Sequence, residues 1–144
     1  MLIKNGLIVS PGNQLEQPAD LRIRNGIIET IAAANSLTAE PDEQVLDASS
    51  LVIAPGLIDI HFHGCKGYDF CDGTKEAIEE IARYEASIGV TAISPATMTL
   101  PVEELERILS VAASYNKENR EGADLVGINI GRSVYQQGKE RRTR

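Results

Sequence analysis

The chain has 144 residues, 42% hydrophobic and 24% charged, a composition typical of a globular protein rather than a disordered one. Its net charge of −7 and isoelectric point near 4.8 argue against nucleic-acid binding, which needs a basic face. Two cysteines are too few for a disulfide framework. No apolar run approaches the ~20 residues of a membrane span, and the N-terminus lacks the pattern of a signal peptide. We therefore expect a cytoplasmic protein that contacts neither membranes nor nucleic acid.

The first 54 residues predict a small antiparallel β-unit with a structural role. Two Asn-Gly pairs, Asn5-Gly6 and Asn25-Gly26, each lie between apolar runs, which is the strongest short-range signal for a β-hairpin. Residues 19–24 alternate polar and apolar side chains, as in a strand buried on one face. Other strands are expected at residues 2–4, 7–9, 27–31, 45–47 and 51–53, and loops at residues 11–13 and 34–43.

From Pro55 onwards, predicted strands alternate with predicted helices. Strands are expected at residues 57–63, 90–94 and 124–130, with helices over 75–88 and from Pro101 onwards. Thr74 is placed to cap the first helix and Gly89 to end it. This alternation predicts parallel strands with right-handed helical connections. A (β/α)8 barrel needs ~250 residues, so residues 55–130 would form only the first β/α units of an incomplete barrel.

Both histidines of the protein lie in the stretch Pro55–Gly64, two residues apart. On a strand over residues 57–63, Asp59, His61 and His63 would share one face. Neutral imidazole is the commonest metal ligand in proteins. We therefore predict that His61 and His63 bind a metal ion, and that Asp59 behind them orients the ligands rather than binding the metal.

The loop after this predicted strand leaves other interpretations open. Cys65 and Cys71 could join His61 and His63 in a small structural zinc module, although the spacing H-x-H-x-C-x5-C matches no common zinc finger. They could equally be ordinary loop or core thiols. Four polar residues in loops after predicted strands could contact a substrate or only support turns: Tyr68, Asp69, Asp72 and Thr97.

The segment P-G-L-I-D-I-H-F-H-G at residues 55–64 resembles the first barrel strand of the amidohydrolase superfamily. Together with residues 64–67, 92–97 and 127–129, it is similar to the N-acetylglucosamine-6-phosphate deacetylases within that superfamily. The resemblance covers residues 1 to about 130. It implies an α/β fold, the start of a (β/α)8 TIM-like barrel, preceded over residues 1–54 by a small β-sandwich unit.

This resemblance also implies an activity. The family members are metal-dependent hydrolases of amino-sugar metabolism, which release acetate from N-acetylglucosamine 6-phosphate to give glucosamine 6-phosphate. One or two divalent ions, zinc or iron, would be held in part by His61 and His63. The partner would be a small sugar phosphate, and the intact enzyme would be a homodimer. An Asp general base is expected outside these 144 residues, so no catalytic acid–base residue is present. The alternative within the superfamily is a dihydroorotase-like cyclic-amide hydrolase.

The sequence departs from the family after Asn129. The family reads G-I-N-M-E-G-P-F there and its Glu is a metal ligand, whereas this chain reads Gly127-Ile128-Asn129-Ile130-Gly131-Arg132. When one base is removed from the Ile130 codon, the codons that follow can read M-E-G-P-F-I-S-K-A-K-N-G-A-H. We therefore interpret residues 131–144 as an out-of-frame, non-native tail, and expect the chain as given to be inactive.

Overall fold

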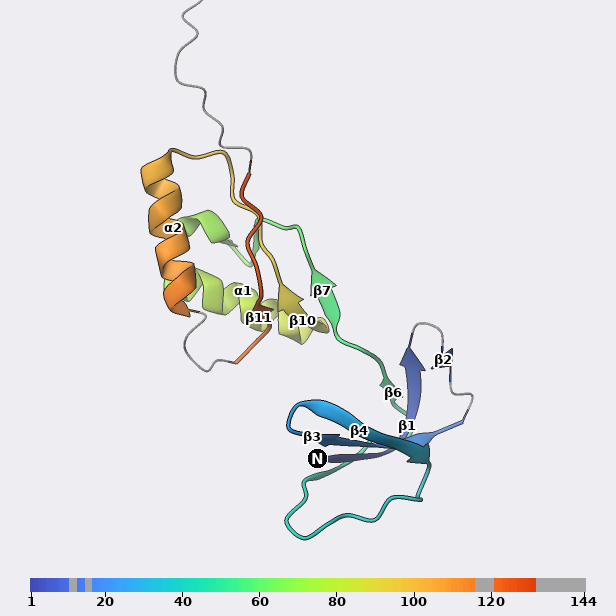
Figure 1. Cartoon of the computed structure of the whole chain (residues 1–144). Coiled ribbons are helices and arrows are strands. Elements are labelled where there is room, and N and C mark those ends of the chain that lie inside the picture. Colours follow the sequence, from blue (N-terminus) through green and yellow to red (C-terminus); the bar gives the residue numbers. More distant parts are fainter. Residues whose placement is uncertain (11–12, 15–16, 116–120, 132–144) are drawn as a thin grey trace, which may run out of the picture. The chain divides into compact units, whose positions relative to one another are not determined.

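The structure is a computed structural model that describes residues 1–10, 13–14, 17–115 and 121–131 (Figure 1). The expected loop at residues 11–13 therefore falls mostly outside the described residues, as does the expected tail from residue 132. The chain divides into two compact units, Met1–Pro55 and Gly56–Arg144. The first unit holds β1 (Leu2–Ser10), β2 (Asn13–Gln14), β3 (Ala19–Arg24), β4 (Ile27–Ala33), β5 (Val45–Asp47) and β6 (Val52–Ile53). The second holds β7 (Leu57–Asp59), β8 (Gly64–Cys65), β9 (Tyr68–Asp69), the 3-10 helix η1 (Phe70–Asp72), α1 (Lys75–Ser87), β10 (Val90–Ile93), α2 (Val102–Tyr115) and β11 (Asp124–Leu125).

The sheet of the first unit is organised around β1. This strand pairs antiparallel with β2 and β3, and β3 pairs antiparallel with β4. However, β5 and β6 run parallel to β1, so the expectation of a purely antiparallel unit is wrong. The reason is the long loop after β4, which returns the chain to the beginning of β1. Val45 consequently pairs with Leu2, and both strands then run in the same direction.

The two Asn-Gly pairs behave differently. Asn25-Gly26 forms the predicted hairpin turn, with φ of 52° and 75°. Asn5-Gly6 instead lies within the continuous strand β1, so the hairpin predicted there is wrong. Asn5 has a φ of 63°, its backbone N–H donates to Asp20 Oδ1 at 3.1 Å, and the pairing with β3 shifts register at this point. A Cβ at Gly6 would collide with the Ile53 side chain, so the pair forms a β-bulge that lets β6 pack closely.

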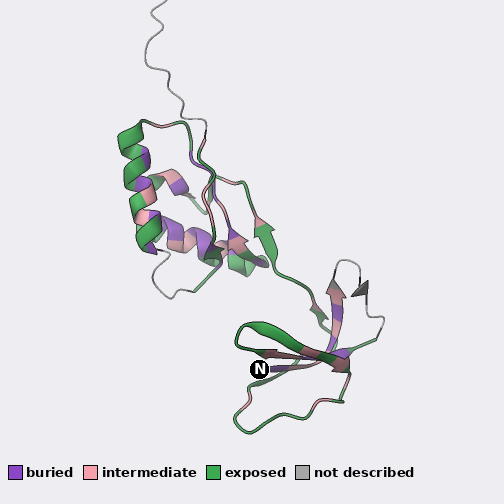
Figure 2. Cartoon of the chain, viewed as in Figure 1, coloured by how far each residue is buried: buried purple, intermediate pink, exposed green. Residues whose placement is uncertain are grey.

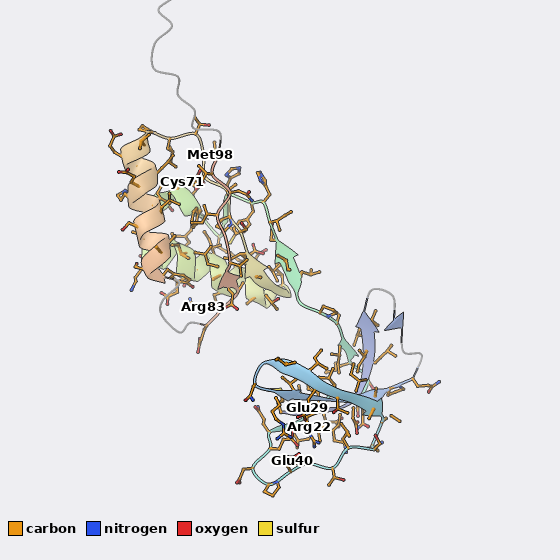
Figure 3. The ribbon with its side chains drawn as sticks, in the orientation of Figure 1. Arg22, Glu29, Glu40, Cys71, Arg83 and Met98 are labelled. Carbon is orange, nitrogen blue, oxygen red and sulfur yellow. The ribbon has the colours of Figure 1, made fainter. Side chains whose placement is uncertain are left out.

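A guanidinium–carboxylate pair ties the loop after β4 to strand β3. Arg22 donates from Nε and Nη2 to the two carboxylate oxygens of Glu43, both at 2.9 Å. The side chains are only 12% and 8% exposed, so water screens them weakly. The hydrogen bond from Arg22 lowers the pKa of Glu43 to about 2. Figure 3 shows Arg22 close to Glu40 and Glu29, the carboxylates of a more exposed group of ion pairs.

The second unit has the predicted strand–helix–strand–helix–strand order. Its sheet has the strand order β11-β10-β7, and both strand pairs are parallel. Thr74 caps α1 by accepting the N–H of Ala77 at 3.2 Å, and Gly89 follows the helix with a φ of 92°. Each helix buries an apolar stripe and exposes its outer side, although Ile88 and Val102, which the helical period also places on these stripes, are 54% and 60% exposed (Figure 2). The stripes are formed by Ile78, Ile81 and Ala82 of α1 and by Leu105, Ile108 and Ala112 of α2.

The strand expected over residues 57–63 is shorter in the structure. β7 ends at Asp59, and the chain then leaves the sheet before forming the β8–β9 hairpin and η1. The hairpin turn at Lys66-Gly67 has a φ of 54° and 84°, and this element was not expected from the sequence. Among the helices of the described residues, none has the length and apolar character needed to span a membrane.

We expect acid to weaken the first unit through Glu43. Because its folded pKa is about 2 and its ordinary value is 4.5, its contribution to stability is complete above pH 4.5 and is lost as the pH falls toward 2. Glu43→Gln should lower stability at pH 7 and remove this part of the pH dependence. Hydrogen exchange of the β3 amides measures the effect, since all four tyrosines lie outside this unit.

The matched control for this pair is Glu29→Gln. Glu29 contacts Arg24 at 3.0 Å, but their side chains are 42% and 48% exposed, and exposed pairs contribute little. An equal loss of β3 protection in the Glu29 and Glu43 variants would contradict the prediction.

The cap of α1 gives a second prediction. Thr74→Ala removes the side-chain acceptor for the Ala77 N–H and should lower the free energy of unfolding by about 1 kcal/mol. Thr74→Ser keeps the hydroxyl and should stay close to the wild type. Urea unfolding followed by tyrosine fluorescence measures both, and equal stability of the two variants would show that the cap contributes nothing.

Candidate functional site

The two histidines lie just beyond the carboxyl end of β7, at the edge of the sheet where β10 and β11 also end. Their rings form an edge-to-face pair, with centroids 5.6 Å apart and planes at 81°. Both residues are exposed. The structure therefore brings His61 and His63 together, although they lie on an irregular segment and not on the strand face that the sequence predicts.

Hydrogen bonds to the sheet hold this irregular segment in place. The last hydrogen bond between β7 and the chain after β10 runs from the N–H of Ser94 to the carbonyl oxygen of Asp59, at 2.8 Å. The N–H of His61 then turns back to Asp59 Oδ1 at 3.0 Å. Contact resumes where Ala96 N–H donates to Phe62 O at 2.7 Å. Asp59 thus acts on the backbone of His61, where it ends the strand; its predicted role of orienting the ligands stays a prediction.

The imidazole of His63 is held by a backbone group. Its Nδ1 lies 3.0 Å from the carbonyl oxygen of Ala96. A carbonyl oxygen can only accept, so this contact requires the proton on Nδ1. The Nε2 lone pair of a neutral His63 is then available to a metal ion, and a ligand oriented through its other nitrogen is the usual arrangement at metal sites.

The spacing of the two rings fits a shared ion, but the donor set is small. An ion bound about 2.1 Å from one nitrogen of each ring would place the centroids ~5.3 Å apart at a tetrahedral angle. The observed separation is 5.6 Å. Within the described part of the chain, no group of three or more His, Cys, Asp or Glu side chains is placed to bind a metal. The spacing of His61 and His63 therefore suits two positions around one ion, and the described residues supply no third ligand.

A buried carboxylate on α1 was missed by the sequence analysis. Glu85 is only 6% exposed, and its pKa is raised by burial and by the negative charge of Asp59. A signal was present, because Glu85 lies four residues after Ile81 and seven after Ile78, on the apolar stripe of the helix. The carboxyl group of Glu85 lies near enough to Asp59, at the end of β7, for the Asp59 charge to disfavour its ionised form.

The cysteines give no support to a four-ligand zinc module. Burial, followed by the charge of Glu85, raises the pKa of Cys65. Burial also raises the pKa of Cys71, whose Sγ accepts the N–H of Met98 at 3.2 Å (Figure 3). Metal binding needs the thiolate, which both environments disfavour. These contacts instead suit thiols that pack the loop against the segment after β10.

The four polar loop residues make local structural contacts. Asp69 Oδ1 accepts the N–H of Cys71 at 2.7 Å, and Asp72 Oδ2 accepts the N–H of Asp69 at 2.9 Å, which together cap η1. The Tyr68 hydroxyl donates to Glu76 at 3.2 Å. Thr97 is buried and accepts the N–H of Gly131 at 3.0 Å. Each of these side chains therefore supports the backbone around the candidate site.

No family model matches the chain. Among curated proteins it is 32% identical to an N-acetylglucosamine-6-phosphate deacetylase of Vibrio furnissii over 120 residues, which are 83% of this chain and 29% of the relative. It is 39% identical to a dihydroorotase of Streptococcus pyogenes over 119 residues, 82% of this chain and 27% of the relative. Both relatives are hydrolases of the amidohydrolase superfamily, to which this chain is similar. The chain spans under a third of the length of these two relatives.

Solved structures agree with this similarity. The fold matches an N-acetylglucosamine-6-phosphate deacetylase from Pasteurella multocida with a TM-score of 0.77 and 20% identity, covering 90% of this chain and 33% of that one. The deacetylase from Thermotoga maritima matches with a TM-score of 0.69 and 26% identity, covering 90% and 31%. The mixed α/β fold with its parallel β/α units is therefore that of amidohydrolases.

We expect zinc binding by this chain to depend on the histidines and not on the cysteines. His61→Asn and His63→Asn should each weaken zinc binding by at least about tenfold, because each removes one of the two available donors. Cys65→Ser and Cys71→Ser should leave it within twofold of the wild type. Competition with a chromogenic chelator measures all four variants. Loss of binding in either cysteine variant would instead favour the four-ligand module.

Proposed function

We propose that this chain derives from a metal-dependent deacetylase that hydrolyses the N-acetyl group of N-acetylglucosamine 6-phosphate, giving glucosamine 6-phosphate and acetate. The observation that carries the proposal is the pair His61 and His63 at the carboxyl end of a parallel strand, with His63 Nδ1 held by the Ala96 carbonyl so that Nε2 is left free. In parallel β/α folds, ligands bind at this end of the strands.

Structural similarity favours this substrate. Besides the Pasteurella and Thermotoga deacetylases, the fold matches a mutant Mycobacterium smegmatis N-acetyl-D-glucosamine-6-phosphate deacetylase in complex with N-acetyl-D-glucosamine-6-phosphate, with a TM-score of 0.71 and 22% identity. A sugar phosphate is accordingly the proposed small-molecule partner, and the whole enzyme would be a cytoplasmic homodimer. Within it, residues 1–54 would form the small β-sandwich unit and residues 55–130 the first β/α units of a TIM-like barrel.

The chemistry assigned to this chain's own residues is limited to holding the ion. His61 and His63 would contribute imidazole nitrogens to one or two ions of zinc or iron, and Asp59 would support the turn that presents them. A divalent ion at such a site polarises an amide carbonyl and lowers the pKa of a bound water. Proton transfer to the leaving amine needs an Asp that is not among these 144 residues.

Dihydroorotase is the second candidate, because the identity to the Streptococcus relative is higher, at 39% against 32%. Both reactions hydrolyse an amide, so the metal-binding part of this chain suits either one. Residues that select a sugar phosphate or a cyclic amide would distinguish them.

We further propose that the 144-residue chain is inactive and that residues 131–144 are read out of frame. The basis is local: a metal-ligand Glu is due at the position of Gly131, and this glycine has no room for a side chain. A Cβ there would lie 2.5 Å from the carbonyl oxygen of Thr97. Two imidazoles without further ligands do not enclose an ion in a dry site.

The purified chain should release no acetate from N-acetylglucosamine 6-phosphate in the presence of zinc or iron. Genomic DNA of the locus should show an open frame encoding E-G-P-F once one base is removed from the Ile130 codon, and the protein from that frame should be a metal-dependent deacetylase. Activity on dihydroorotate alone would select the second candidate. Activity of the 144-residue chain, or an intact frame without that motif, would refute the out-of-frame interpretation.

A further inference from the structure

The sheet has a gap in its hydrogen bonding directly before the histidines. β7 and β10 are parallel neighbours, and their pairing shifts register between Val90 and Ala92 and continues as far as the bond from Ser94 N–H to Asp59 O. The next residue, Pro95, is fully buried and faces the β11 side, where its carbonyl accepts the N–H of Asn129. On the other strand, the N–H of His61 is already used by Asp59 Oδ1. The carbonyl groups of Ile60 and Ser94 therefore face this gap without a backbone donor from the neighbouring strand.

The side chain of Asn129, which follows β11, supplies the missing donor. Its Nδ2 donates to the carbonyl oxygen of Ile60 and lies 3.4 Å from that of Ser94. One amide group thus connects the segments that follow three strands, because Ile60 follows β7, Ser94 follows β10 and Asn129 follows β11. An NH2 group carries two N–H donors, so it can satisfy two carbonyl oxygens at once.

The backbone of Asn129 is held on both sides by the segment after β10. Its N–H donates to Pro95 O at 2.8 Å, and its carbonyl accepts the N–H of Thr97 at 2.8 Å. The buried Thr97 hydroxyl also accepts the N–H of Gly131 at 3.0 Å. These bonds on either side of Asn129 fix where its side chain begins, so the amide is directed into the gap by the surrounding backbone.

We propose that Asn129 is a positioning residue for the histidine pair. By holding the Ile60 carbonyl, it fixes the peptide that joins Ile60 to His61 and so sets the place where the chain leaves the sheet. From there the chain reaches Phe62 and His63, which are fixed by Ala96. The proposal rests on the metal-binding function proposed for His61 and His63, but the geometry it describes exists without a metal.

The test uses the full 144-residue chain and two variants of Asn129. Asn129→Leu keeps a similar shape and removes both donors, while Asn129→Ala removes the side chain. The matched control is Ile108→Val, or Ile108→Ala if a larger loss of stability is needed for the match. Ile108 lies on α2, is fully buried in the core and takes no part in the hydrogen bonds around the gap that are described above, so it separates a general loss of stability from a local effect.

Two measurements are needed. The first is zinc affinity, which should fall about tenfold in both Asn129 variants and stay within twofold of wild type in the Ile108 control of equal stability. The second needs no metal: NMR of the wild-type chain should show a scalar coupling across the hydrogen bond from Asn129 Nδ2 to the Ile60 carbonyl. In the Asn129 variants, the ring-to-ring contact between His61 and His63 should weaken.

The outcomes separate this proposal from the proposed function. If the wild-type chain binds no zinc, the metal site fails, and the coupling and the ring contact still decide the role of Asn129. Absence of the coupling in the wild type, or unchanged histidine ring contacts in a folded Asn129 variant, would overturn the positioning role. Equal losses of zinc affinity in the Asn129 and Ile108 variants would also overturn it, since they would reflect stability alone.

Discussion

The end of the pairing between β7 and β10 is the constraint on which the candidate site depends. The Asp59 carboxylate takes the N–H of His61 that would continue the ladder, so the strands stop pairing at this point. Donors from other parts of the chain satisfy carbonyl groups beyond it. Asn129 does so at Ile60, and Ala96 does so at Phe62. The chain can therefore leave the sheet within two residues and still present both imidazoles in a defined geometry.

The regular elements could be predicted because their signals are local. The cap at Thr74, the stop at Gly89 and the apolar stripes of both helices each depend on residues within a few turns. Asn25-Gly26 also formed the expected turn. Asn5-Gly6 carries the same signal but forms a bulge, since its conformation depends on Asp20 and on the approach of Ile53, which lie far away in the sequence. The direction of β5 and β6 depends likewise on where a long loop returns.

In the candidate site, too, some features could be predicted from the sequence and others could not. The proximity of His61 and His63 could be predicted from their spacing in the sequence, and it did not require the full predicted strand, while their role as metal ligands stays a prediction. The supporting contacts could not be identified. The Ala96 carbonyl has no side-chain signature, and the donor role of Asn129 depends on the end of the pairing after Asp59, which is distant in the sequence. The burial of Glu85 is an exception, because its spacing from Ile78 and Ile81 places it on the apolar stripe of α1 and could have been recognised in the sequence.

The exposed apolar side chains of the sheet explain why these polar contacts matter for the described residues. Ile58 is 64% exposed, Ile60 67% and Val126 63%. Parallel sheets are normally covered on both faces, and in this chain the two helices bury only part of the apolar surface of the strands. Packing therefore contributes little to the position of Ile60, the residue directly before His61. Its carbonyl bond to Asn129 becomes the interaction that restrains it, so the histidine geometry depends on hydrogen bonds between strand ends more than on hydrophobic burial.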